Sequence, residues 1–242
     1  GAGDPDYSAM QGGKALKRVD VLFLLDKGQS KDKLIELRRE ICERYITDPG
    51  YRFAEADSPE RERGDVDYTA SVDDLNRAKQ QTFERLINDE MSDGECGGFL
   101  VWGDPALYDS TVRILNAILA SGRCAFEFEV IPGITSVQAL AAQHKVPLNT
   151  IGRSIEITTG RRLAAGQVSD ADSLVVMLDA EDSYHHVADP QTEIYWGAYL
   201  GTPDEILISG KLGDVADEIE RVRKAARLKH GWIMDTYLLR KP

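Results

Sequence analysis

The sequence predicts an α/β protein of two domains. The N-terminal domain is expected to hold a mostly parallel sheet with helices on both faces, and the C-terminal domain a mixed α+β arrangement. In the first half of the chain, strand-like apolar runs alternate with helical patterns, and such units build parallel sheets. The second half contains five strand-like runs but a single strong helical pattern. We therefore expect domains at 1–150 and 151–242, with a cofactor in the cleft between them.

The N-terminal domain alternates between the two element types along its length. Apolar runs typical of buried strands occupy 19–25, 51–56, 98–102 and 126–131. A helical pattern follows each run, over 32–46, 72–91, 108–120 and 135–143. Turns of glycine and proline end the third and fourth runs, and ligands of a parallel sheet gather at such carboxyl ends of strands.

In the C-terminal domain the strands outnumber the helices. We expect strands at 154–159, 173–178, 193–200, 205–209 and 232–238. The strong helical pattern covers 215–228, and the break between the domains falls near 149–152. This succession is typical of an α+β domain.

The composition limits the partners of this chain. Of its 242 residues 42% are hydrophobic, but no run approaches the roughly 20 apolar residues of a membrane span. The formal net charge of −12 repels nucleic acid and anionic membranes, so neither is an expected partner. An anionic small molecule would need a local basic pocket.

The N-terminus and the cysteines favour a cytoplasmic protein. The first residues lack the basic and apolar regions of a signal peptide. They form a glycine-rich turn with no strand before it, so we expect that a few native residues precede Gly1. Cys42, Cys96 and Cys124 are widely spaced and odd in number, as free thiols of a reducing compartment would be. The four histidines lack metal-binding spacing, and the sequence predicts no metal site.

Three glycine-rich turns are the main functional signal. They are Gly1-Ala2-Gly3-Asp4-Pro5, Gly103-Asp104-Pro105 and Pro132-Gly133-Ile134-Thr135-Ser136. Each one alone is compatible with ordinary turn chemistry. Together, in this order and within the stretches WGDPALYDST and VIPGITSVQALAA, they resemble the tetrapyrrole methylase family.

That family carries a GxGxGDP-type start, a YGDP-like loop and a PG turn in the same order. The resemblance extends over essentially the whole chain. It implies two α/β domains with S-adenosylmethionine between them, a homodimer, and transfer of a methyl group to a porphyrin-like macrocycle. This chain has Ala2 and Trp102 where many members have proline and tyrosine.

Four further stretches narrow the resemblance to members that act on precorrin-5 in the oxygen-dependent cobalamin pathway. They are GAGDPDY at the start, LLDKG at 24–28, LRREICERYI at 37–46 and TTGRRLAAG at 158–166. Both departures from the general pattern fit this subgroup. The resemblance then implies methylation of carbon 1 of precorrin-5, with loss of the acetyl group at that carbon as acetate.

The cofactor-binding residues that the resemblance implies come from both domains. They are Asp4, Pro5, Trp102, Gly103, Asp104, Pro105, Tyr108, Thr135, Ser136, Met177, Leu178, Ala198 and Tyr199. Glycines let a backbone come close to a ligand. Asp104 could hold the ammonium of the cofactor, face the substrate, or only cap its turn, and Thr135 and Ser136 also fit a helix N-cap.

The substrate carries many carboxylates, which guanidinium groups bind well. The candidates for that role are Arg161, Arg162, Lys27 and Arg113, although a solvated helix face is the alternative for Arg113. Methyl transfer needs no acid or base from the protein, whereas deacetylation needs an activated water. Asp104 and Tyr108 are the catalytic candidates, and Asp26 is a third.

Two other functions stay open at this point. One is a methyltransferase of the same fold with another acceptor, such as a different precorrin carbon or the histidine-derived residue that diphthine synthase modifies. The other is a cofactor-binding protein without turnover, for instance a truncated or regulatory relative. The stretch TTGRRLAAG favours the precorrin-5 reaction over both.

Overall fold

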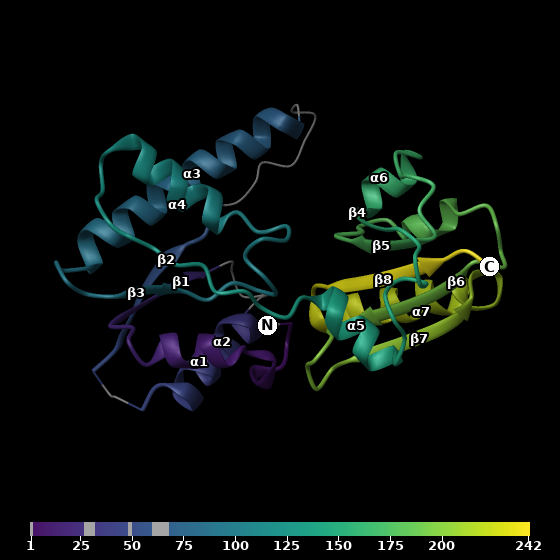
Figure 1. Cartoon of the computed structure of the whole chain (residues 1–242), viewed down its shortest axis with the longest axis horizontal. Helices are drawn as coiled ribbons and strands as arrows, with labels where there is room; N and C mark the ends of the chain where they lie inside the picture. The colour runs from purple at the N-terminus through teal and green to yellow at the C-terminus, as the bar shows by residue number, and fades with distance from the viewer. Residues whose placement is uncertain (1, 27–31, 48–49, 60–67) are drawn as a thin grey trace. The chain divides into compact units, whose positions relative to one another are not determined.

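The structure, a computed structural model, describes residues 2–26, 32–47, 50–59 and 68–242. It divides into two compact units (Figure 1). The N-terminal unit takes the described residues of 5–133, and the C-terminal unit takes 2–4 together with 134–242. The division after Gly133 precedes the predicted break near 149–152. Helix α5 (Ser136–His144) accounts for the difference, because it packs on the sheet of the C-terminal unit.

A parallel sheet of three strands forms the centre of the N-terminal unit. Its strands are β1 (Val21–Asp26), β2 (Arg52–Asp57) and β3 (Gly97–Phe99), in the order β2-β1-β3. Val21 lies opposite Arg52 on one side and opposite Gly97 on the other. Alternation of strands and helices therefore predicted the parallel pairing correctly.

Helices cover both faces of this sheet (Figure 1). They are α1 (Met10–Leu16), α2 (Asp32–Tyr45), α3 (Tyr68–Glu90) and α4 (Thr111–Ser121). Leu22 packs with Leu16 of α1 and Cys42 of α2. Its neighbours Val21 and Phe23 pack with Leu86 of α3 on the opposite face, since successive strand side chains alternate.

Several elements of this unit differ from the prediction. Helix α1 was not predicted, and α3 begins at residue 68 rather than 72. Strand β3 ends at Phe99 rather than residue 102, because only its first three residues pair with β1. Helix α4 begins at Thr111, because Tyr108 has a positive φ of 52° that a helix does not accept. The strand predicted at 126–131 is absent. Phe126 and Phe128 do pack beside the α3–α4 cluster, but the described segment has no ladder partner.

The C-terminal unit contains a mixed sheet of five strands. They are β4 (Ile155–Thr159), β5 (Ser173–Met177), β6 (Glu193–Ala198), β7 (Ile206–Lys211) and β8 (Asp235–Arg240). The order is β4-β5-β8-β6-β7, with β4 and β5 parallel and the other pairs antiparallel. The predicted fold class, an α/β protein whose second domain is mixed, is confirmed.

Both faces of the mixed sheet are covered, although unequally. Helices α7 (Leu212–His230) and α6 (Gly160–Ala164) and the 3-10 helix η3 (Ser183–His186) enclose the larger core, with Trp196 and Tyr237 at its centre. Helix α5 packs on the other face against β6, β7 and β8. Of the helices in the described ranges, none has both the length and the apolar character that a membrane span requires.

Replacement of Leu140 by alanine tests the packing of α5. Leu140 is fully buried, and a Cβ atom on Gly197 of β6 would lie 2.8 Å from its Cδ1. We expect Leu140→Ala to lower the free energy of unfolding by about 2–5 kcal/mol, because it leaves a cavity. Urea unfolding followed by circular dichroism measures this change. Leu228→Ala is the control, because Leu228 is 86% exposed and should change stability by less than about 0.5 kcal/mol.

Candidate functional site

Two of the predicted glycine-rich turns meet in the N-terminal unit. Oδ2 of Asp104 accepts a hydrogen bond from the backbone N–H of Gly133 at 2.7 Å, and Oδ1 accepts one from Ala106 at 2.7 Å. A Cβ atom on Gly133 would overlap the carbonyl oxygen of Gly103, so this contact requires glycine. The loop after β3 and the Pro132-Gly133 turn are thus fixed to each other, backbone against backbone.

Asp104 caps its turn, as its two hydrogen bonds to backbone N–H groups show. Each of its carboxylate oxygens already accepts one backbone N–H and has a second acceptor position. Trp102 and Pro105, on either side, are partly buried. A role for Asp104 toward a cofactor or a water stays a prediction.

Tyr108 lies in strained backbone on the same loop. Its φ is 52° and its side chain is 48% exposed, so about half of the ring lies in solvent. The next residue, Asp109, accepts a hydrogen bond from the N–H of Thr111 at 2.7 Å. From α2, Arg38 donates to the carbonyl oxygen of Leu100 at 3.0 Å. The loop is therefore held at both ends, with Tyr108 directed outward between them.

The described residues among the remaining predictions for this unit lie on separate elements. Pro5 opens the 3-10 helix η1 (Pro5–Tyr7), and its carbonyl oxygen accepts a hydrogen bond from Tyr45 at 3.4 Å. Arg113 lies exposed on α4, which fits the alternative of a solvated helix face. Lys27 and the side chain of Asp26 lie outside the described residues.

In the C-terminal unit the predicted residues lie along one edge of the sheet. Strands β4, β5 and β6 point the same way, because β8 runs antiparallel to both β5 and β6. Thr236 of β8 lies opposite Met177 of β5 and opposite Gly197 of β6. Met177 and Ala198 end their strands at this edge, and Leu178 and Tyr199 follow them. Ligands of α/β folds gather at such carboxyl ends.

Leu178 and Tyr199 have positive φ values of 53° and 50° but differ in burial. Leu178 is 64% exposed. Tyr199 is buried, and its hydroxyl donates to the carbonyl oxygen of Trp232 at 2.6 Å. Burial raises the pKa of Tyr199 to about 12, and the nearby Asp204 adds to the rise. Its ring therefore belongs to the core, and Ala198 is equally buried.

The first residues of the chain lie against the turn that follows β6. Gly3 has a φ of 80°, and a Cβ atom there would overlap the carbonyl oxygen of Leu200. The N–H of Asp4 donates to the carbonyl oxygen of Ala2 at 3.0 Å. The glycine-rich start of the chain therefore belongs to the same unit as Leu178 and Tyr199, and it lies against Leu200, the residue after Tyr199.

The N-terminus of α5 is capped and tied to the same sheet edge. Oγ1 of Thr135 accepts the N–H of Val137 at 3.1 Å, and Gln138 completes a capping box. The hydroxyl groups of Ser136 and Thr236 are 2.9 Å apart. The N-cap alternative for Thr135 is confirmed, and Ser136 lies beside the β8 residue that faces Met177.

The two adjacent arginines follow β4 on the short helix α6. Both are exposed, and Arg162 donates to the carbonyl oxygen of Gln167 at 2.8 Å. Gly160, just before them, is buried against Asp179, whose carboxylate a Cβ atom at 160 would overlap. Recognition of substrate carboxylates by Arg161 and Arg162 stays a prediction.

Backbone strain coincides with the predicted site. Among the described residues other than glycine, positive φ values occur at Tyr108, Lys145, Leu178, Asp182 and Tyr199. Three of the five are residues that the sequence assigned to cofactor binding. Strained backbone persists only where the surroundings determine it, and it concentrates at functional sites.

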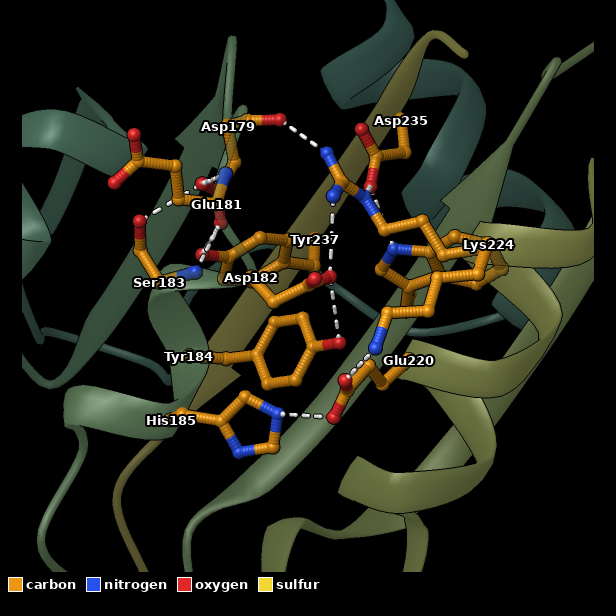
Figure 2. A network of polar contacts seen from close by, with 12 residues as sticks. Asp179, Glu181, Asp182, Ser183, Tyr184, His185, Glu220, Lys224, Asp235 and Tyr237 are labelled. Atoms are coloured by element: carbon orange, nitrogen blue, oxygen red, sulfur yellow. Dashed lines mark hydrogen bonds and ion pairs between the residues drawn. The ribbon is translucent and has the colours of Figure 1, made fainter. Parts of the chain in front are cut away.

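A buried polar network beside Leu178 was missed in the sequence (Figure 2). It joins Asp179, Asp182, Tyr184, Arg223 and Asp235. One signal could have revealed it, because Arg223 occupies the apolar face of its helix, four residues after the buried Ile219. Within the described residues, no three His, Cys, Asp or Glu side chains form a group that could hold a metal ion.

The fold and the order of the turns define a class of protein. Residues 1–216 match the family model of the tetrapyrrole (corrin/porphyrin) methylases. The chain belongs to this family.

Individual members of the family differ in how similar they are to this chain. The chain is 50% identical, over all of its length and 92% of the relative, to a precorrin-6A synthase [deacetylating] of Sinorhizobium sp.. A solved structure of a cobalamin synthesis related protein from Corynebacterium diphtheriae is 33% identical, with a TM-score of 0.84 over 99% of this chain and 94% of that one. A uroporphyrin-III C-methyltransferase structure from Thermus thermophilus, 17% identical, shares the fold with a TM-score of 0.63 over 100% of this chain and 91% of that one.

Replacement of Gly133 by alanine tests the contact between the two turns. The added Cβ would overlap the carbonyl oxygen of Gly103, so one of the backbones must move. We expect Gly133→Ala to lower the free energy of unfolding by about 1–3 kcal/mol in urea titrations.

Gly12→Ala is the matched control for this prediction. Gly12 lies inside α1, and a Cβ atom there meets nothing within 4 Å. Alanine at this position should leave stability unchanged or raise it by up to about 1 kcal/mol. Equal unfolding midpoints for Gly133→Ala and the unmodified chain would show that the turns are not in contact.

Proposed function

We propose that this chain is an S-adenosylmethionine-dependent C-methyltransferase of corrin biosynthesis. Its reaction methylates precorrin-5 at carbon 1, releases the acetyl group of that carbon as acetate, and gives precorrin-6A. The observation that carries the proposal is the 50% identity, over the full chain, to a deacetylating precorrin-6A synthase. The stretch TTGRRLAAG and the three glycine-rich turns support it from the sequence.

The residues of each unit fit a nucleoside cofactor with an amino-acid tail. Exposed Leu178, held in strained backbone, offers an apolar surface for a flat base. The Gly103 and Gly133 turns pack backbone against backbone, which fixes the loop after β3 on which Asp104 and Tyr108 lie. When bound, S-adenosylmethionine supplies an electrophilic methyl group on a sulfonium. The part of the protein is to hold donor and acceptor in line and to exclude water.

The two events of the reaction fit together chemically. A water attacks the acetyl carbonyl, the bond between the acetyl group and carbon 1 breaks, and acetate leaves. The electron pair of that bond stays on carbon 1, which can then take the methyl group. A transfer that annihilates charge in this way is favoured in a dry pocket.

Deacetylation is the step for which the chain must provide a group of its own. We assign Asp104 and Tyr108 as the candidates, because both lie on the loop after β3 and Tyr108 is exposed in strained backbone. Asp104 is held by two backbone N–H groups, which keeps its carboxylate in one orientation. Such a fixed carboxylate can orient a water as general base.

Recognition of the substrate carboxylates is assigned to Arg161 and Arg162. Both side chains are exposed, at the end of β4 and on the sheet edge that carries Leu178. A net charge of −12 makes a local pair of guanidinium groups necessary for an anionic substrate. Lys27 and Arg113 remain further candidates from the sequence.

The proposal extends to the assembly and location of the enzyme. We infer a homodimer, which the family resemblance implies, and a cytoplasmic location. The three cysteines are free thiols in the structure, which suits a reducing compartment. Light scattering coupled to size-exclusion chromatography tests the dimer.

Calorimetric titration with S-adenosylhomocysteine tests the cofactor, and turnover tests the reaction. We expect one molecule bound per chain with micromolar affinity. With precorrin-5 and methyl-labelled S-adenosylmethionine, we expect one acetate released for each methyl transferred. Binding without acetate, but with methylation of another precorrin, would favour the alternative acceptor. Binding without any turnover would favour a cofactor-binding relative.

Replacement of Asp104 by asparagine tests the base. A general base contributes about 10²–10⁴-fold, so we expect Asp104→Asn to lower the rate of acetate release by at least about 100-fold. Asp109→Asn is the control, because Asp109 also caps a turn of the same loop and has no assigned role in catalysis. Retained acetate release in Asp104→Asn would remove Asp104 and leave Tyr108, tested by Tyr108→Phe.

A further inference from the structure

The end of β5 carries a residue that the fold does not place by itself. Leu178 has a φ of 53° and leaves 64% of its side chain in solvent. A leucine pays a steric penalty in left-handed backbone and gains no burial here. Other interactions must therefore fix this conformation, and they should be found in the residues next to Leu178.

The first of these interactions is made by Asp179, which follows Leu178 and is buried. Its carboxylate accepts four hydrogen bonds: from the N–H of Glu181 at 3.1 Å, from the N–H and Oγ of Ser183 at 2.7 and 2.8 Å, and from the hydroxyl of Tyr237 at 2.7 Å. Gly160 closes the remaining side. The carboxylate of Asp179 thus fixes the turn 179–184 to β8.

The second interaction comes from Arg223 of α7, which is bonded to two residues of the same turn. Its guanidinium donates to the carbonyl oxygen of Asp179, to Oδ1 of Asp182 at 3.1 Å and to Oδ2 of Asp235 at 2.9 Å. Arg223 is 5% exposed. Three donors in a rigid fork suit three fixed acceptors, which a lysine would not satisfy at once.

Asp235, at the start of β8, is the third residue bonded to Arg223. Its Oδ2 also accepts the indole N–H of Trp196 at 2.9 Å. Burial raises the pKa of Asp235, and hydrogen bonds from Arg223 and Trp196 oppose that rise. Asp182 has a positive φ of 54° and accepts the hydroxyl of Tyr184 at 2.9 Å. Asp182, the strained residue within 179–184, is therefore bonded to the guanidinium of Arg223.

We propose that Arg223 and Asp235 are positioning residues, which hold the turn 179–184 so that Leu178 stays exposed for the cofactor. This inference rests on the proposed function, because it takes the adenine of S-adenosylmethionine as the group that Leu178 meets. Both side chains are buried, so the role assigned to them is to hold the turn rather than to contact the cofactor. Their effect is on the population of the binding-competent turn, and hence on affinity.

The test uses the full chain and the variant Arg223→Lys, which keeps the charge and loses the fork. If the competent turn falls to about a tenth of the molecules, the Kd for S-adenosylhomocysteine rises about tenfold. At saturating S-adenosylmethionine the ligand restores the turn, so kcat should stay within about twofold while KM for this substrate rises. Hydrogen exchange of a peptide covering 178–184 should be faster in the unliganded variant.

The control is Ile219→Ala, one turn earlier on α7. Ile219 is fully buried in the same core and makes none of these hydrogen bonds. This variant should lose stability but keep the Kd within about twofold. Tyr237→Phe is a second, milder variant in case Arg223→Lys does not fold. It removes one hydrogen bond to Asp179 and should raise the Kd about threefold.

Several outcomes would overturn the inference. One is a folded Arg223→Lys chain that binds S-adenosylhomocysteine like the unmodified chain. Another is an equal loss of affinity in Ile219→Ala, which would mean that only general stability matters. Should Arg223→Lys fail to fold, unchanged binding by Tyr237→Phe would overturn it. Absence of binding by the folded, unmodified chain would contradict the proposed function as well, and is thereby distinguished from the other results.

Discussion

The polar turn at the end of β5 depends on a single buried guanidinium. Arg223 of α7 contacts a strand through Asp235, and a turn through Asp182 and the carbonyl oxygen of Asp179. Removal of one partner from such a set leaves an uncompensated buried charge, at a cost of about 3–5 kcal/mol. Hydrophobic contacts could hold α7 on the sheet without it. They could not fix the direction of a polar turn, which requires directional bonds.

The two units share a local arrangement in the loops that follow β3 and β5. In each, an exposed residue with a positive φ is followed by an aspartate that accepts the N–H two positions further on. Asp109 does so for Thr111 after Tyr108, and Asp179 does so for Glu181 after Leu178. An Asx turn of this kind supports the chain just beyond the strained residue. The side chain is then presented to solvent by its backbone rather than by core packing.

The sequence predicted what depends on local pattern, and missed what depends on distant partners. Alternating apolar and helical patterns suffice for the fold class, and the order of the glycine turns suffices for the family. The alternation of Phe126 and Phe128 shows that one side packs, but a strand also needs a neighbour with free backbone groups. Arg223 bonds the carbonyl oxygen of Asp179, 44 positions earlier in the chain, a pairing that no spacing rule contains. Only the position of Arg223 on an apolar helix face marked it in advance.

Asp179 connects the two halves of the proposed chemistry within the C-terminal unit. Its carboxylate fixes the turn behind Leu178, which we assign to the cofactor, and it also lies against Gly160, which precedes Arg161 and Arg162. A side chain at 160 would push α6 away from β5 and move both arginines relative to Leu178. Transfer between two bound molecules is sensitive to displacements of about 1 Å. Gly160 and the buried carboxylate of Asp179 therefore serve the same purpose. Their contact fixes the arginines that would bind the acceptor relative to Leu178, which would bind the donor.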